Sequence, residues 1–367
     1  MSIHPPVDRD DPLGPDSSIR EPGAAAVACA LAIALAMVFL TRLPVARQVP
    51  LESDEFGFLE AIEASWFPMH HTLFLTSAKA IGAAVGSPYR GFLLLDMLMS
   101  GVALASAWWW LRALVAPRPA AAGTILLGSA PLFWGYGAMA GNYTAIIAVG
   151  SFLLGVAVRS WRRPAAWHPF AAAVVLGLGT GYRQDIGTFW LPIFLVILWR
   201  HRWSRGFLAG LLFAGINLAW LSAMLHDAGG WSAYRAKSAE FAYQAGYLNS
   251  VWSLGVVDAP VRYSVKLGMA LLWTLGPVIL AAPRGFLRLR GREGGVALSW
   301  LLLLSMSLPL LSHLLVHFGV QGYAFHYVPA LLAFCVLGIG GSRTVETQTA
   351  SEAGAGGLLS SPCPRLV

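Results

Sequence analysis

Long apolar runs separated by short polar segments make up most of this 367-residue chain. The first run, Gly23 to Leu40, has 18 residues and no charge. As a helix this is about enough to cross a ~30 Å hydrocarbon core. Nine further runs lie at roughly 91–111, 119–136, 140–158, 166–182, 185–199, 206–225, 265–283, 296–316 and 322–341. The pattern predicts an all-α, polytopic transmembrane helical bundle of about 10 spans, within a range of about 9–11.

Composition supports a membrane protein. Hydrophobic residues make up 57% of the chain, mean hydropathy is +0.63 and only 12% of residues are charged, against about 25% in soluble domains. The formal net charge of +7 comes from arginines bunched in short loops, which is typical of membrane topology rather than of nucleic-acid binding. The three cysteines show neither metal-ligand spacing nor a disulfide pattern.

The arginines also orient the bundle. With the amino terminus inside, 16 of the 25 Lys and Arg residues lie in the inner segments, which are the leader, 112–118, 159–163, 200–205, 284–292 and the tail. This bias follows the positive-inside rule. It predicts a disordered cytoplasmic leader over 1–22, a bundle over 23–343 with outer loops 42–90 and 226–264, and a disordered cytoplasmic tail over 344–367.

Three segments allow alternatives. The stretch Thr72 to Gly86 has 15 residues and carries Lys79. A single span there would turn the later arginine loops outside, so we interpret it as a helix at the outer interface, with a full span as the alternative. The first run is interpreted as an uncleaved span rather than a signal peptide, because the leader is long and acidic. Loop 226–264 is rich in Trp and Tyr, which favour the headgroup zone, and an interfacial helix is expected around 232–247.

Ionisable groups are scarce, and the pair Asp54–Glu55 lies shortly after the first run. Lost solvation beside an apolar surface raises the pKa of a carboxyl group and allows it to act as a general base near neutral pH. Asp54 and Glu55 are therefore the candidate catalytic residues. Further acidic residues lie nearby in the same loop, so a solvated acidic loop is the alternative interpretation.

Other polar residues reach the same outer side in this topology. His70 and His71 are candidates for hydrogen bonds to a phosphate or an acceptor, with an interfacial His pair as the alternative. Arg183 is a candidate for a bidentate phosphate contact; the alternative is a local Arg183–Asp185 ion pair that caps two helices. The remaining candidate binding residues are Arg90, Asn142, Tyr143, Asp185 and Tyr323.

Two further features carry less weight. Asp96 lies inside a span, where an unpaired carboxylate is costly, and it is interpreted as pairing with a neighbouring arginine. His313, His317 and His326 are too loosely spaced to be more than a weak metal signal. No P-loop, Rossmann, kinase or zinc-protease motif occurs, which favours a lipid-borne donor over a nucleotide.

The order of these features resembles the GT-C superfamily of membrane glycosyltransferases, which includes protein O-mannosyltransferases and bacterial lipid A aminoarabinose transferases. Asp54-Glu55 lies in the first outer loop, Pro68-Met69-His70-His71 resembles the stretch before a juxtamembrane helix, and Arg90 opens the next span. Ala130-Pro131-Leu132-Phe133-Trp134 with Asn142-Tyr143 is similar to an SPLFW…E-x-Y pattern of a bacterial subgroup. Gly322-Tyr323 with Pro329-Ala330-Leu331 resembles a late-span pattern. Where the subgroup has Glu before the Tyr, this chain has Asn142.

The resemblance implies a GT-C-like bundle in a bacterial inner membrane and a polyprenyl-phosphate sugar donor. It also implies inverting transfer on the outer face, with Asp54 as the base. The acceptor is a lipid, a glycan or a protein; no cofactor is specified and a divalent metal stays open. A polytopic transporter or flippase for a lipid-linked or small polar substrate is the alternative, and a non-catalytic assembly subunit is a third. A transporter predicts functional charges near the bilayer midplane, whereas the best polar groups here lie at one face.

Overall fold

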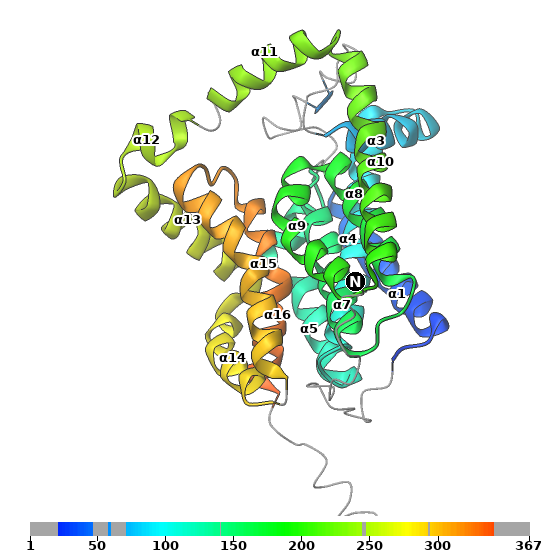
Figure 1. Cartoon of the computed structure of the whole chain (residues 1–367), viewed down its shortest axis with the longest axis vertical. Helices are drawn as coiled ribbons and strands as arrows, with labels where there is room; N and C mark the ends of the chain where they lie inside the picture. Colours follow the sequence, from blue (N-terminus) through cyan, green and yellow to red (C-terminus); the bar gives the residue numbers. More distant parts are fainter. Residues whose placement is uncertain are drawn as a thin grey trace, which may run out of the picture.

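The computed structural model describes residues 21–46, 58–59, 71–139, 141–243, 247–292 and 294–340. Every regular element within these ranges is a helix (Figure 1), which confirms the all-α prediction for this part of the chain. Three of the candidate site residues, Asp54, Glu55 and His70, lie outside the described residues, as do the leader to position 20 and the tail from position 341.

The main helices correspond to the apolar runs. They are α1 (Ala24–Arg42), α4 (Pro88–Leu111), α5 (Pro117–Ser129), α7 (Thr144–Arg162), α8 (His168–Tyr182), α9 (Gln184–Trp199), α10 (Trp203–Asp227), α13 (Asp258–Leu275), α15 (Gly295–Leu315) and α16 (Val328–Ile339). Six of the described segments are long and apolar enough to cross a membrane, and α9 and α16 are shorter apolar helices. The Trp110 indole on α4 donates a 2.9 Å hydrogen bond to the Pro329 carbonyl on α16, which joins distant parts of the sequence in the core.

Three of the predicted runs are not single α-helices. Ala130 has ψ 128° and ends α5, because the following Pro131 disfavours a helical residue before it; α6 (Pro131–Tyr136) then starts anew. The run 265–283 divides at Gly276, whose φ is +59°, into α13, the 3-10 helix η4 (Gly276–Ala281) and α14 (Ala282–Arg290). The last run begins with the 3-10 helix η5 (Gln321–His326) before α16.

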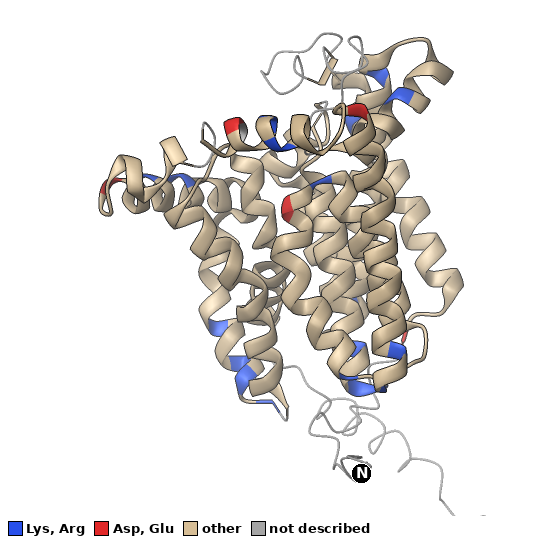
Figure 2. Cartoon of the chain, turned by 45° about the horizontal axis from the view of Figure 1, so that its top comes forward, with Lys and Arg blue, Asp and Glu red and all other residues tan. Residues whose placement is uncertain are grey.

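The arginine-rich loops gather at one end of the bundle. Arg162, the last residue of α7, donates to the Ala113 carbonyl after α4, and Arg292 after α14 donates to the Leu114 carbonyl. Figure 2, in which the ribbon is blue at Lys and Arg, shows several of these positions gathered at this lower end. Because the helices alternate in direction, the α8–α9 turn, the start of α7 and η5 lie at the opposite end, which we call the upper end, as in Figure 1.

Helix α3 (Thr72–Val85) begins and ends at the upper end. At its start, His71 Nδ1 lies 3.4 Å from the Tyr182 carbonyl oxygen at the end of α8. Near its other end, Gly82 packs so closely on Pro88 at the start of α4 that a Cβ atom would come within 2.9 Å of the Pro88 Cα. The helix therefore does not run from one end of the bundle to the other, and its place at an outer membrane interface stays a prediction.

The second predicted outer loop also lies at the upper end and is largely helical. It contains α11 (Trp231–Phe241), the 3-10 helix η3 (Tyr247–Asn249) and α12 (Val251–Leu254), which extend across the top of the bundle in Figure 1. Helix α13 already begins at Asp258, so residues predicted as the end of the loop form its first turns.

Candidate functional site

The turn between α8 and α9 holds a buried ion pair. Arg183 leaves the helical conformation, with φ −148° and ψ 121°, so one helix ends before it and the next begins after it. Its Nε donates to Asp185 Oδ1 at 3.1 Å and its Nη2 to Asp185 Oδ2 at 2.8 Å. The Arg183 side chain is only 3% exposed. The structure therefore has the local ion pair, one of the two arrangements that the sequence left open for Arg183.

Three more of the candidate binding residues surround the Arg183 guanidinium. Nη1 donates to the side-chain oxygen of Asn142, immediately before α7. The Arg183 Cζ lies 4.2 Å from the ring centroid of Tyr143 and 5.3 Å from that of Tyr323, which are cation–π distances. Residues from three separate parts of the sequence thus form one cluster of Asn142, Tyr143, Arg183, Asp185 and Tyr323, called the Arg183 cluster below.

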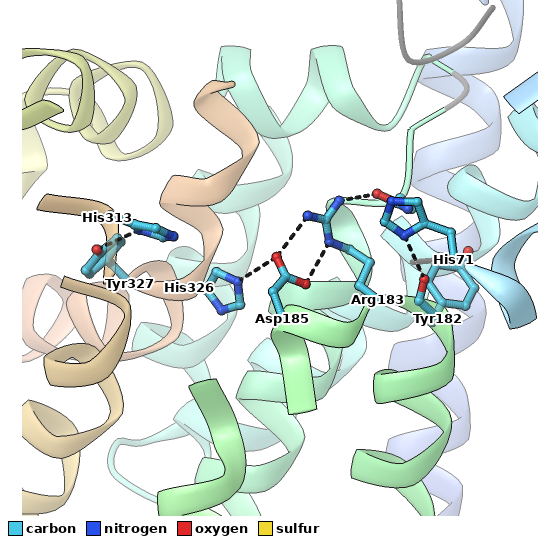
Figure 3. Close-up of polar contacts among 8 residues, drawn as sticks. His71, Tyr182, Arg183, Asp185, His313, His326 and Tyr327 are labelled. Carbon is cyan, nitrogen blue, oxygen red and sulfur yellow. Dashed lines mark hydrogen bonds and ion pairs between the residues drawn. The ribbon is translucent and has the colours of Figure 1, made fainter. Parts of the chain in front are cut away.

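Two buried histidines extend this cluster. His326 is fully buried, and its Nε2 lies 3.5 Å from Asp185 Oδ2. His313 is 1% exposed, and its Nδ1 lies 2.9 Å from the Tyr327 hydroxyl. In Figure 3, His326 and Arg183 lie on opposite sides of the Asp185 carboxylate. The sequence offered these histidines only as a weak metal signal, because they are loosely spaced. It did not indicate the contact between His326 and Asp185, which are 141 positions apart.

Several polar atoms of the site have no hydrogen-bond partner among the residues that the structure describes. They are Asn142 Nδ2, His326 Nδ1, His313 Nε2 and His317 Nδ1, all buried. Buried polar groups are normally satisfied by protein, water or ligand, so these atoms are available to a bound polar molecule. The part of the chain that the structure describes has no group of three or more His, Cys, Asp or Glu side chains able to hold a metal ion.

His317 lies in the loop between α15 and η5, at the edge of the site. Its ring is 6.4 Å from the Tyr263 ring and 6.2 Å from the Tyr323 ring. Burial, together with the nearby Lys266 ammonium, lowers the pKa of His317 below its ordinary value of 6.5. The imidazole is therefore neutral at physiological pH.

The other two described candidates are placed differently. His71, through its 3.4 Å approach to the Tyr182 carbonyl, lies beside the residue that precedes Arg183. Arg90 is exposed on the first turn of α4 and makes no hydrogen bond or ion pair with the described residues of the Arg183 cluster. The structure thus brings His71 next to the cluster and leaves Arg90 outside it.

A second buried polar group, the pair of Asp96 and Thr144, lies next to the cluster, because Thr144 is two residues after Asn142 in the chain. Asp96 is fully buried, and its Oδ1 accepts a 2.6 Å hydrogen bond from the Thr144 hydroxyl. Arg42, 1% exposed at the end of α1, acts on Asp96 as the neighbouring charge. The described residues show no ion pair between the two side chains, so the pairing with a neighbouring arginine stays a prediction, and Thr144 is the hydrogen-bond partner of Asp96.

An open groove adjoins the cluster between α6, α13 and η5. It has a volume of about 350 Å³ and is mostly apolar, with Lys266 and Gln321 as its polar lining residues. Tyr136, which also lines it, lies 5.0 Å from the Tyr143 ring between centroids. The groove therefore brings an apolar surface and the Lys266 ammonium close to Tyr143 of the Arg183 cluster.

Comparison with known proteins adds the fold class. No protein-family model matches the sequence, and no curated protein matches it. Among solved structures, the chain is similar to ArnT from Cupriavidus metallidurans, crystallised bound to undecaprenyl phosphate, with a TM-score of 0.63 and 11% identity. The likeness covers 91% of this chain but 63% of ArnT, so the chain spans less than two-thirds of that protein. At this identity the likeness is one of fold alone, and it agrees with the all-α, GT-C-like bundle that the sequence predicted.

Proposed function

We propose that this chain is an inverting membrane glycosyltransferase that moves a sugar from a polyprenyl-phosphate donor to an acceptor on the non-cytoplasmic face. The proposal rests on one observation. The segment that carries Asp54 and Glu55 follows the 3-10 helix η1 (Leu43–Val45) and precedes His71, and His71 Nδ1 lies 3.4 Å from the carbonyl oxygen of Tyr182, the residue before Arg183. The chain therefore returns from the segment with the candidate base directly beside the Arg183 cluster.

The groove between α6, α13 and η5 suits the donor. A polyprenyl phosphate combines a long apolar tail with an anionic head, and the groove combines apolar walls with the Lys266 ammonium. The phosphate would bind at Lys266 and Gln321 while the tail follows the walls into the bilayer. Lateral entry of this kind keeps the tail in lipid throughout. Lys266 takes the role of first phosphate contact, which the sequence had assigned to Arg183.

In this proposal Arg183 does not contact the reacting groups and acts on them through its charge. Three of its N–H directions are already used by Asp185 and Asn142, and the side chain is nearly inaccessible. Its guanidinium, held in place by its partners, would favour the negative charge that develops on the leaving phosphate. Asp185 and Asn142 hold the guanidinium in place, and Tyr143 and Tyr323 shield it.

The chemistry requires one proton acceptor. A hydroxyl or amine of the acceptor attacks the anomeric carbon, Asp54 takes its proton, and the bond from the anomeric carbon to the phosphate oxygen breaks with its electron pair on the phosphate. Attack from the face opposite the phosphate inverts the anomeric centre. Glu55 is the second carboxylate in reach along the chain and would hold the acceptor or the base.

Mass spectrometry of glycans and envelope lipids, from cells with and without the gene, tests the function directly. We expect one molecule to lose a sugar in the deletion strain, and the wild-type gene to restore it. The Asp54→Asn variant should insert in the membrane but fail to restore the sugar. Glu52→Gln, in the same acidic segment, is the matched control and should restore it. Full restoration by Asp54→Asn would exclude Asp54 as the base, and an unchanged glycan and lipid profile would contradict the transferase function.

A further inference from the structure

A second groove opens on the outside of the bundle, at the arginine-rich lower end. Its volume is about 490 Å³, within the ~300–1,000 Å³ of ordinary small-molecule sites. The end of α7, the end of α9 and the first half of α15 form its walls, which include Trp161, Val196, Trp199, Trp300 and Leu304. Nothing in the proposed transfer reaction uses this groove.

The groove opens towards the surroundings of the protein rather than into its core. Trp199 is 72% exposed and Trp300 65% exposed, so both rings lie on the outer surface of the bundle. In a membrane that surface meets lipid, and Trp favours the depth where acyl chains meet headgroups. The walls therefore suit acyl chains at the level of the membrane interface.

Positive charge borders the same groove. The guanidinium of Arg200, the residue after α9, lies 4.6 Å from the centroid of the Trp161 ring, and its Nη2 donates a 3.3 Å hydrogen bond to the Trp161 carbonyl. Arg162 and the exposed Arg163 follow Trp161 directly, and Figure 2 shows several Lys and Arg positions on the ribbon at this end of the bundle. Basic pockets between transmembrane helices on the cytoplasmic side are typical sites for anionic lipid headgroups.

We propose that this groove binds an anionic phospholipid of the surrounding leaflet, with its acyl chains against the three tryptophans and its phosphate near Arg200. A second copy of the chain fits less well, because a symmetric contact would bring the same arginines together. A polyprenyl-phosphate donor bound here would lie at the opposite end of the bundle from the Arg183 cluster. The proposal does not depend on the transferase function.

Native mass spectrometry of the full chain, purified in mild detergent, tests the proposal with added dioleoylphosphatidylglycerol and dioleoylphosphatidylcholine as probes. The wild type should retain phosphatidylglycerol in preference to phosphatidylcholine. Leu304→Trp fills the groove and should lower this retention several-fold. Leu311→Trp is the matched control, since Leu311 lies seven residues further on the same face of α15, outside the groove, and it should retain the lipid.

Arg200→Gln provides an independent variant that leaves the groove open. It should bind phosphatidylglycerol about fivefold more weakly, because one arginine near a membrane surface contributes ~1 kcal/mol to the binding of an anionic lipid. Its binding of phosphatidylcholine should be unchanged. Equal retention by Leu304→Trp and Leu311→Trp would overturn the proposal. The proposal would also be overturned if the lipid that co-purifies with the wild type and is displaced by Leu304→Trp were undecaprenyl phosphate. It would be overturned as well if the wild type were a dimer that Leu304→Trp dissociates.

Discussion

Arg183 and Asp185 share two parallel hydrogen bonds, of 3.1 and 2.8 Å, across the turn that joins α8 to α9. Only Gln184 separates them, and the extended conformation of Arg183 lets both side chains point to the same side of the turn. The pair is the centre of the site, because Asn142, Tyr143 and Tyr323 contact the arginine and His326 contacts the carboxylate.

Asp185→Asn should destabilise the protein by about 3–5 kcal/mol, the usual cost of leaving one charge of a buried pair without its partner. Thermal unfolding in detergent measures the loss. Asp227→Asn is the control: among the described residues Asp227 pairs with His226, whose side chain is 91% exposed, and an exposed pair contributes about 0–1 kcal/mol. If both variants unfolded at the wild-type temperature, the ion pair would not support the site.

Gly322→Ala should displace Tyr143 from Arg183. A Cβ atom at position 322 would overlap the Tyr143 ring, and relief of such overlap typically costs about 1–3 kcal/mol. Gly135→Ala, on the neighbouring α6, has nothing within 4 Å of its added Cβ. As a Gly-to-Ala change in a helix, it should stabilise by about 0.4–1 kcal/mol. Opposite shifts in the unfolding temperature are therefore expected, and equal shifts would contradict the close packing of Gly322 on Tyr143.

Lys266→Met should weaken binding of undecaprenyl phosphate about tenfold or more, since a hydrogen bond to a charged group contributes about 1.5–3 kcal/mol. Methionine approximates the apolar stem of lysine and lacks the terminal ammonium group with its charge and hydrogen-bond donors. Lipid titration followed by native mass spectrometry gives the affinity. Lys237→Met, on α11 away from the groove, should bind as the wild type does, and a similar loss in both variants would indicate a general effect of net charge.

Acidification should destabilise the protein in part through His317. Because burial and Lys266 lower its pKa in the folded state, the unfolded chain takes up the proton as the pH falls through 6.5 while the folded protein still resists it. The stability that the neutral ring contributes is present above this pH and is lost below it. Unfolding temperatures from about pH 8 to about pH 5 should fall less steeply in His317→Gln than in the wild type. Parallel curves for the two proteins would contradict this contribution.

Part of the candidate site could be found from the sequence. Asn142, Tyr143, Arg183, Asp185 and Tyr323 were selected because each is a polar or aromatic residue at the end of an apolar run, and runs that alternate in direction return to the same end. The contact of His326 with Asp185 could not be found in this way. It depends on how η5 packs against α9, and no local pattern near position 326 encodes that packing.

The sequence by itself determined the membrane architecture. In a bilayer, the length and hydropathy of a run decide whether it forms a helix, and the arginine loops decide which ends lie together, so local information is enough. Only the tertiary structure decided that Arg183 is enclosed by its partners, that Arg90 lies outside the cluster and that Lys266 borders a groove. These facts follow from side-chain packing between helices far apart along the chain, and packing depends on shape and distance rather than on the order of residues.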